Sequence, residues 1–376
     1  MDKNRFLLYS TIFLIMGLSD AVIPVLPELA AANNGSNGAF ASSLLFSGYF
    51  IGALLTMLPF GILADRYDHL RFIVLSVLLT LVSGMFLAIS DNLYILIVAR
   101  FMEGSACGAF FPAAYAMLSE YVNKNRYIGE LNFLLNAGLA LGVAIAGYLT
   151  QWFIRGGIFL FTGLAGILFL IGLLMLRSQP NIVRIKSKEP FTTSVISEIR
   201  KFRFILFNKN YISIWITTFL LFGISGVLMA FYPDFSKDFL SKTELGVTIG
   251  LLYVSSMITN IVVGRANINY REMIKYGIII ASLGTLISIK YPLIGFTLIG
   301  VGTGAGMIGL PIAVTHMNIK KGVAMGFFNT STYAGLGIMP ILLGFFLNTL
   351  GFQLLFAISA LILFLSIFFK DGLKSE

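Results

Sequence analysis

Long apolar stretches, separated by short polar connections, fill most of this chain. Each is close to the roughly 20 residues that an α-helix needs to cross a bilayer. A longer polar and basic stretch, 178–208, separates two groups of six. The pattern predicts an all-α membrane protein with twelve spans, made of halves 1–177 and 209–376 and a linker at 178–208. The predicted spans are 6–29, 40–63, 71–90, 93–118, 128–150, 156–176, 211–233, 245–264, 274–290, 292–315, 322–347 and 352–369.

The composition agrees with lipid as the surrounding solvent. Of the 376 residues, 57% are hydrophobic and 11% are charged, whereas a soluble domain carries about 25% charged residues. The single cysteine, Cys107, excludes an intrachain disulfide framework, and two histidines leave little for metal binding. We therefore expect no metal, no cofactor and no enzymatic activity, because no catalytic constellation is present.

A cleaved signal peptide is the alternative reading of the first span. Lys3 and Arg5 resemble its basic start, and Ala30–Ala32 resemble a cleavage site. The apolar run is too long for a signal peptide and contains Asp20. We expect a retained span.

The distribution of Lys and Arg predicts the orientation. The net charge is +9, and most basic residues fall in the connections that share a side with both chain ends. Cytoplasmic loops are enriched in Lys and Arg, so the pattern predicts a multi-pass protein of the cell membrane with both termini cytoplasmic. The basic run from Arg184 to Arg203 is suited to anionic lipid headgroups. Nucleic acid is not needed to explain the charge.

The connection between the second and third spans carries a motif. It reads Gly61-Ile62-Leu63-Ala64-Asp65-Arg66 and is followed by Arg71. This resembles the G-x-L-A-D-R-x-G-R-R/K signature of the major facilitator superfamily, with Asp68 in place of the later glycine. The resemblance implies two six-helix bundles related by a pseudo-twofold axis, with substrate bound between them. We predict that the motif residues Gly61, Asp65, Arg66 and Arg71 form a cytoplasmic gate in the outward-open state. Asp65 is expected near the start of the eleventh span, around Gly322–Gly326, where helix N–H groups favour an anion, and Glu120 is the expected partner of Arg66 or Arg71.

Two further segments resemble the twelve-span drug–proton antiporter branch of that superfamily. The fourth span reads Arg100-Phe101-Met102-Glu103-Gly104, followed by Gly108, similar to the branch's R-x-x-x-G pattern. The approach to the eleventh span and the span itself are similar to the branch's penultimate helix. Two segments depart from the pattern: the fifth span has Gly142-Val143 instead of Gly-Pro, and the second copy of the loop signature reads Gly264-Arg265-Ala266-Asn267.

Three ionisable residues stand inside predicted spans. Asp20 lies in the first span, and Arg100 and Glu103 lie one helical turn apart in the fourth. Ionisable residues inside spans are rare and usually functional. Burial favours a protonated carboxyl, and a nearby guanidinium favours the carboxylate. We expect a proton-coupling site at these three residues; the alternative is an ion pair that only fixes packing.

Several amides share helix faces with polar neighbours. Buried amides need partners, which are either other helices or a wet cavity, and the sequence leaves both open. We predict a substrate cavity lined by Glu103, Asn132, Asn136, Asn260, Asn329 and Tyr333.

The string Gly304-Ala305-Gly306-Met307-Ile308-Gly309 matches G-x-G-x-x-G. It lies inside an apolar helix and not after a strand, so helix packing explains it better than dinucleotide binding. No G-x-x-x-x-G-K-[ST] motif is present, which argues against direct ATP drive.

Together these features predict a monomeric secondary active transporter that works by alternating access and exports its substrate in exchange for protons. Its expected partners are a small lipophilic or amphiphilic molecule, protons and the lipid bilayer. Three alternatives remain: a metabolite facilitator or symporter for a sugar or nucleoside, a non-transporting membrane sensor or scaffold and, more remotely, a membrane enzyme.

Overall fold

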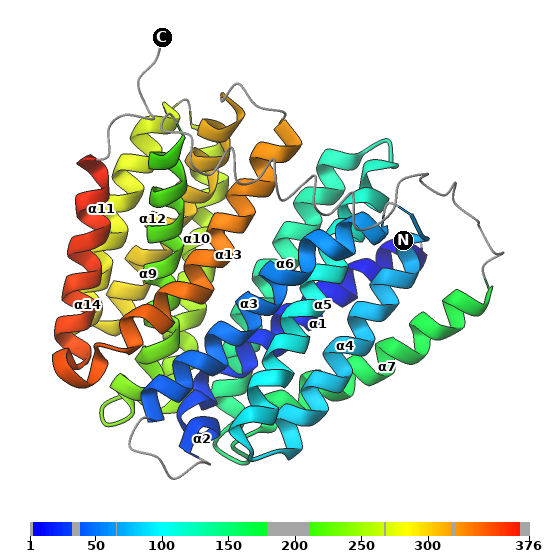
Figure 1. Ribbon diagram of the computed structural model, residues 1–376, viewed down its shortest axis with the longest axis horizontal. Helices are drawn as coiled ribbons and strands as arrows, with labels where there is room; N and C mark the ends of the chain where they lie inside the picture. The colour runs from blue at the N-terminus through cyan, green and yellow to red at the C-terminus, as the bar shows by residue number, and fades with distance from the viewer. Residues whose placement is uncertain are drawn as a thin grey trace. The chain divides into compact units, whose positions relative to one another are not determined.

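The computed structural model describes residues 3–31, 38–64, 66–178, 211–266, 268–316 and 321–368. The predicted linker, apart from Ser178, and the motif residue Asp65 lie outside these ranges. All the described secondary structure is helical (Figure 1), which confirms the predicted fold class.

Each predicted span after the first coincides with one helix. Side-chain N-caps begin several of these helices: Asp68 caps the start of α4 and Asn92 caps the start of α5. The long helices are α1 (Lys3–Ala21), α3 (Gly38–Ala64), α4 (His69–Ile89), α5 (Leu93–Ser119), α6 (Lys124–Leu149), α7 (Gly156–Ser178), α9 (Ile212–Ser236), α10 (Lys242–Arg265), α11 (Tyr270–Ser288), α12 (Pro292–Thr315), α13 (Lys321–Gly344) and α14 (Leu347–Leu365).

The first predicted span is not one regular helix. After α1 the chain forms a 3-10 turn, η1 (Ile23–Val25), and then the short helix α2 (Leu26–Ala31). Pro24 and Pro27 lack the N–H that an α-helix needs, which accounts for the break. The start of α14 also differs from a regular helix, because Gly351 adopts a left-handed backbone with φ 70° that glycine permits without strain.

Within the described residues, ten helices, counting α1 and α2 together, are long and apolar enough to cross a membrane. The two predicted spans outside this set are α11 and α13. The first turns of α11 contain Arg271, Glu272 and Lys275, and the middle of α13 contains the polar run Asn329–Thr332. These polar residues lower the hydropathy of both helices without interrupting them.

The described residues divide into two compact units. Unit 1 takes its residues from Met1–Gly38, Gly48–Glu198 and Leu240–Gly246, and unit 2 from Ala39–Ser47, Ile199–Phe239 and Val247–Glu376. Each unit is largely one half of the sequence. The exceptions are the first turns of α3, which belong to unit 2, and the first turn of α10, which belongs to unit 1. The two helices are the second span of their halves.

The two units repeat one packing scheme. In unit 1, α1 packs against α6 and α7, and α4 packs against α5 and α7. In unit 2, α9 packs against α13 and α14, and α11 packs against α12 and α14. When the spans are numbered from one to six within each half, the same pairs are in contact in both: one with five, one with six, three with four, and three with six. The sequence halves are therefore an internal structural repeat, and Figure 1 shows the helices of each lying side by side.

Glycines allow the closest helix contacts in both units. In unit 1, Gly142 of α6 lies against α1, where an added Cβ would come within 2.8 Å of the Gly17 Cα. In unit 2, Gly335 of α13 lies against α9 in the same way, with its Cβ 3.0 Å from the Gly223 nitrogen. Real Cβ atoms do not approach so closely, so these seams require glycine.

The first turn of α10 is held within unit 1 by polar contacts. The Nζ of Lys242 donates to the Pro24 carbonyl at 2.7 Å and pairs with the Glu28 carboxylate at 2.8 Å. Next to it, the Thr243 hydroxyl donates to the Gly147 carbonyl at 3.2 Å. These bonds explain why this turn belongs with α2 and α6.

Candidate functional site

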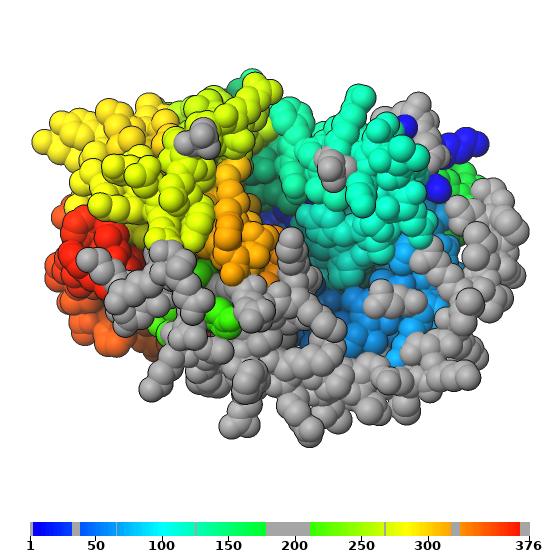
Figure 2. Space-filling model, turned by 90° about the horizontal axis from the view of Figure 1, so that it is seen from above, coloured from blue at the N-terminus to red at the C-terminus, as the bar shows by residue number. Residues whose placement is uncertain are grey.

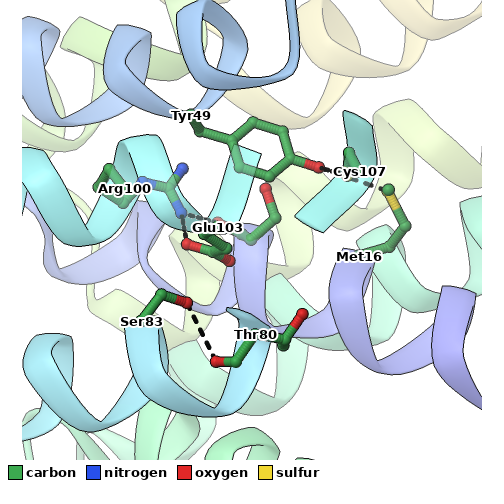
Figure 3. Close-up of polar contacts among 8 residues, drawn as sticks. Met16, Tyr49, Thr80, Ser83, Arg100, Glu103 and Cys107 are labelled. Atoms are coloured by element: carbon green, nitrogen blue, oxygen red, sulfur yellow. Dashed lines mark hydrogen bonds and ion pairs between the residues drawn. The ribbon is translucent and has the colours of Figure 1, made fainter. Parts of the chain in front are cut away.

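The most buried charges of unit 1 lie on α5. Arg100 and Glu103 are 1% and 0% exposed, and a guanidinium nitrogen of Arg100 lies 2.6 Å from Oε2 of Glu103 (Figure 3). The same nitrogen donates to the backbone carbonyl of Ser19 in α1 at 3.4 Å. The second oxygen of Glu103, Oε1, has no hydrogen-bond partner within the described part of the chain. One acidic oxygen is therefore kept from both water and protein donors.

Asp20 completes the set of buried charges. It follows Ser19 near the end of α1, immediately before the break at η1, and is 3% exposed. Since Arg100 reaches the carbonyl of Ser19, the structure brings the end of α1 and the middle of α5 together. We call Asp20, Arg100 and Glu103 the charge cluster.

Tyr49 of α3 covers the cluster, and sequence analysis missed it. Its ring centroid lies 5.0 Å from the Arg100 guanidinium carbon, a cation–π distance. Its hydroxyl is 2.8 Å from the Cys107 thiol and 3.9 Å from the Met16 sulfur. Figure 3 shows the ring between Arg100 and the two sulfurs. The sequence feature that could have indicated this contact is the pair Gly48 and Gly52 on either side of Tyr49, because these glycines allow α3 to approach α5 closely.

A row of buried hydroxyls on α4 was also missed. Ser76, Thr80 and Ser83 are at most 1% exposed, and their spacing of four and three residues places them on one helix face. Each donates to a carbonyl of its own helix, for example Ser83 to Thr80 at 3.0 Å (Figure 3). They make one face of α4 polar but carry no charge.

The predicted cavity amides have different surroundings in the two units. On α6, the Asn136 side chain donates to the Asn132 carbonyl at 2.9 Å, and Asn132 is exposed. In unit 2, Asn329 and Tyr333 of α13 are half-buried. Asn260 of α10 has a buried Oδ1 with no hydrogen-bond partner among the described residues, so this atom can accept a bond from a ligand or water.

The motif residues other than Asp65 lie between α3 and α4 or at the end of α5. Gly61 packs near Pro112, with an added Cβ 3.7 Å from that ring. Arg66 is half-buried in the turn, Arg71 is exposed in the first turn of α4, and Glu120 is the exposed C-cap of α5. The expected pairing of Glu120 with Arg66 or Arg71 stays a prediction.

This end of unit 1 also has a surface ion pair. The start of α6, coloured teal, stands at the surface in Figure 2, and Arg126 there is 75% exposed and pairs with Glu130 at 2.8 Å. The Tyr9 hydroxyl of α1 donates to the other oxygen of Glu130 at 2.8 Å. These contacts join α1 to α6.

Unit 2 has no such cluster at the equivalent place. Gly104 of α5 lies against the Tyr49 carbonyl of α3, and Gly300 of α12 lies against the Leu252 carbonyl of α10. In each half, a glycine of the fourth span thus packs against a carbonyl of the second span. Gly104 and Gly300 are therefore equivalent positions of the repeat. Four residues before Gly300 stands Phe296, which is 0% exposed and lies 4.7 Å from the Tyr232 ring.

Ile299 is the equivalent of Glu103 in this alignment and is 1% exposed. Within the described helices of unit 2, carboxylates stand only near helix ends, at Asp234 of α9 and Glu272 of α11. The same helix pairing is thus packed by Arg and Glu in one unit and by Phe and Ile in the other.

An internal repeat of six spans, with buried charges in one copy, is typical of membrane transporters. The sequence model of the Major Facilitator Superfamily matches residues 8–228 and 214–372. The chain therefore belongs to the major facilitator superfamily, and it is a multi-pass membrane transporter of small molecules.

Individual relatives agree with this assignment. An uncharacterized MFS-type transporter of Methanocaldococcus jannaschii is 25% identical over 376 residues, covering 96% of this chain and 95% of that protein. The quinolone resistance protein NorA of Staphylococcus aureus is 27% identical over 257 residues, covering 66% of this chain and 63% of NorA.

Solved structures share the fold at low identity. A crystal structure of the nucleoside transporter NupG matches with a TM-score of 0.79 at 14% identity, covering 99% of this chain and 100% of that one. A peptide transporter POT matches with a TM-score of 0.78 at 12% identity, covering 98% and 93% of the two chains.

Proposed function

We propose that this transporter exports a small lipophilic or amphiphilic molecule in exchange for protons, by alternating access. The charge cluster supports this proposal. An ionisable residue at the centre of a span costs roughly 2.5–3.5 kcal/mol on insertion scales. Three such residues in one unit need a reason.

The asymmetry between the units carries the proposal. The alternative is that Arg100 and Glu103 only fix helix packing. The equivalent helices of unit 2 pack without them, using Phe296 and Ile299, which are equally buried. The repeat shows that this helix pairing does not depend on charge. This asymmetry supports a role for the unit 1 charges beyond packing, and movement of protons is the chemistry that buried carboxyls near a guanidinium can provide.

The cluster is suited to binding and releasing a proton. Arg100 is shared between Glu103 and the end of α1. A shift of the guanidinium toward Asp20 would favour the Asp20 carboxylate and leave Glu103 to take up a proton; a shift back would reverse this. Arg100 pairs with Glu103 and reaches the carbonyl of Ser19, the residue before Asp20, so we expect the two acids to exchange protons as a coupled set. A conformational change that moves α1 against α5 would load one proton and release it on the other side.

The charge cluster also limits the substrate class. A largely apolar site with carboxylates suits a lipophilic cation or a neutral amphiphile, because an anion would be repelled. The name of the NorA relative, a quinolone resistance protein, supports a drug-like substrate. A metabolite facilitator of the same fold is the second candidate, supported by the likeness to a nucleoside transporter. We further propose that Glu103, Asn132, Asn136, Asn260, Asn329 and Tyr333 line the substrate cavity.

The remaining parts of the proposal concern gating and placement. We propose that Gly61, Asp65, Arg66, Arg71 and Glu120 form a cytoplasmic gate in the outward-open state. The basic connections support a cell-membrane protein with cytoplasmic termini. We also propose domains at 1–177 and 209–376 joined by the linker 178–208, and a monomeric transporter.

Flux in proteoliposomes tests the proposed function. The purified full chain is reconstituted and offered lipophilic cations, sugars and nucleosides, each with and without a pH gradient. We expect uphill movement of a lipophilic cation that collapses when an ionophore removes the gradient. Gradient-independent equilibration of a sugar or nucleoside would favour the facilitator instead. Absence of flux for every compound would favour a sensor or scaffold.

A further inference from the structure

The position of Tyr49 gives it a role beyond covering the charge cluster. Residues Ala39–Ser47 of α3 belong to unit 2, and α3 belongs to unit 1 from Gly48 onward. Tyr49 is therefore the second residue after the point at which the helix passes from one unit to the other. We therefore expect the transport cycle to act on α3 near this point.

The part of α3 before this point is fixed within unit 2. The Phe40 ring lies 5.0 Å from the Phe345 ring, and an added Cβ on Gly344 would lie 2.9 Å from Phe40. These contacts anchor the first turns of α3 to the end of α13.

The part after this point can approach α5 closely because two of its residues, Gly48 and Gly52, have no side chain. An added Cβ on Gly48 would lie 3.3 Å from the Arg100 Cβ, and one on Gly52 would overlap the Phe101 carbonyl. Small residues let the backbones of neighbouring helices approach this closely. Tyr49 is the side chain of this stretch that reaches both the Arg100 guanidinium and the sulfurs of Cys107 and Met16.

We propose that Tyr49 is a positioning residue that transmits movement of α3 to the Arg100 guanidinium and so links the conformational change to the protonation of Asp20 and Glu103. Its aromatic face holds the guanidinium over Glu103. When α3 is drawn away from α5, the ring leaves the guanidinium, which is then free to turn toward α1. The hydroxyl, held by the Cys107 thiol, sets the angle of the ring. This inference rests on the proposed proton exchange.

Substitutions at Tyr49 separate the ring from the hydroxyl. Tyr49→Phe keeps the cation–π face, and Tyr49→Leu removes it. We expect Tyr49→Phe to retain proton-driven uphill flux within about threefold, and Tyr49→Leu to lose about tenfold or more, in keeping with the strength of a desolvated cation–π contact. Downhill substrate exchange, which needs no net proton movement, should fall much less in Tyr49→Leu. A purely structural tyrosine would lower both fluxes together.

A matched control comes from unit 2. Tyr232 is 0% exposed, its hydroxyl donates to the Ser288 carbonyl at 2.6 Å, and its ring lies among phenylalanines. Tyr232→Leu removes a comparable buried ring where no charge is present. We expect it to reduce exchange and uphill flux in the same proportion, if it reduces either.

Cys107 supplies a second readout that does not depend on proton coupling. It is the only cysteine, and its thiol is buried beside Tyr49. If α3 moves away from α5 during the cycle, the rate at which a small maleimide alkylates Cys107 should rise by about tenfold under a substrate gradient in the wild type. In Tyr49→Leu the rate should be high with or without the gradient.

The outcomes distinguish the two proposals. If the wild type shows no proton-driven flux, the proposed function fails, and a gradient-dependent alkylation rate would still support movement at Tyr49. If the wild type is coupled and Tyr49→Leu keeps its ratio of uphill flux to exchange, the role of Tyr49 is wrong. Loss of coupling in Tyr49→Phe equal to that in Tyr49→Leu would also overturn the assignment to the ring.

Discussion

The guanidinium of Arg100 and the carboxylate of Glu103 are separated by 2.6 Å and are almost wholly buried, whereas Phe296 and Ile299 occupy the equivalent places in unit 2. A buried ion pair is seldom the most stable filling of such a place, because the desolvation of two charges offsets their attraction. Its presence in one copy of the repeat and its absence from the other support the proposed role of the pair in transport.

Exchanging this pair for its counterpart tests that distinction. We expect Arg100→Phe with Glu103→Ile to fold with unchanged or higher thermal stability, because well-packed apolar residues replace a buried ion pair at a change of about 0 to 4 kcal/mol in favour of folding. Proton-driven flux should be lost. Thermal unfolding in detergent and flux in proteoliposomes measure the two effects.

The single change Arg100→Ala provides the comparison. It leaves Glu103 buried beside a cavity, and the loss should be about 3–5 kcal/mol if Glu103 stays charged. A double exchange as unstable as Arg100→Ala would contradict the view that packing does not need the charges.

The glycine seam beside the cluster should tolerate no larger residue. Gly104 lies directly against the Tyr49 carbonyl. A Cβ added to Gly104 would also lie only 2.8 Å from the Ala53 nitrogen. Gly104→Ala should force α3 and α5 apart and cost about 1–3 kcal/mol or more. Gly163 of α7 has open space around its Cβ position, so Gly163→Ala is the control and should change the unfolding temperature little. Equal effects of the two changes would refute the seam.

The proposed cytoplasmic gate gives a conformational prediction. Asp65→Asn should shift the protein away from the outward-open state. A helix N-terminus stabilises a nearby carboxylate, and we expect Asp65 to lie near the start of the eleventh span. Labelling of a cysteine introduced on the cytoplasmic side, in a Cys107→Ala background, measures this shift. Asp68→Asn is a suitable control, since it removes a charge from the same loop and asparagine also caps helices. An unchanged labelling rate in Asp65→Asn would rule out its part in the gate.

Asn260 gives a prediction about substrate binding. Its Oδ1 is buried without a hydrogen-bond partner in the described structure, and a bound ligand would satisfy it. Asn260→Leu should raise the KM by about threefold to tenfold with little change in folding, since one hydrogen bond contributes about 0.5–1.5 kcal/mol. Asn123, exposed at the N-cap of α6, provides the control Asn123→Ser. A KM unaffected by Asn260→Leu would place Asn260 outside the cavity.

Much of the fold follows from the sequence because bilayer thickness sets helix length. The predicted spans and helices agree within a few residues, and the two exceptions, η1 and the Gly351 kink, occur where proline or glycine changes the backbone. The pairing of Arg100 with Glu103 also follows from their spacing on one helix.

What the sequence did not predict depends on contacts between distant segments. Tyr49 stands among apolar residues of α3, and nothing local shows that its ring covers Arg100, fifty-one positions away. The exchange of the first turns of α3 and α10 between units is likewise invisible in periodicity, since Lys242 and Glu28 are far apart in the chain. Arg100 and Phe296 could be recognised as equivalent positions only from the way Gly104 and Gly300 pack. The two halves share no obvious sequence motif at this place.

The most direct test of proton coupling at Asp20 and Glu103 is uphill flux driven by a pH gradient in proteoliposomes. It is measured for Asp20→Asn, for Glu103→Gln and for the double change. Glu28→Gln, which neutralises an acid paired with Lys242 outside the cluster, is the matched control. Each substitution fixes one carboxyl in its neutral form. We expect Asp20→Asn and the double change to lose uphill flux and to keep substrate exchange. Glu103→Gln should weaken the coupling of transport to protons, and Glu28→Gln should leave it intact. Full uphill transport by the double change would contradict proton coupling at Asp20 and Glu103.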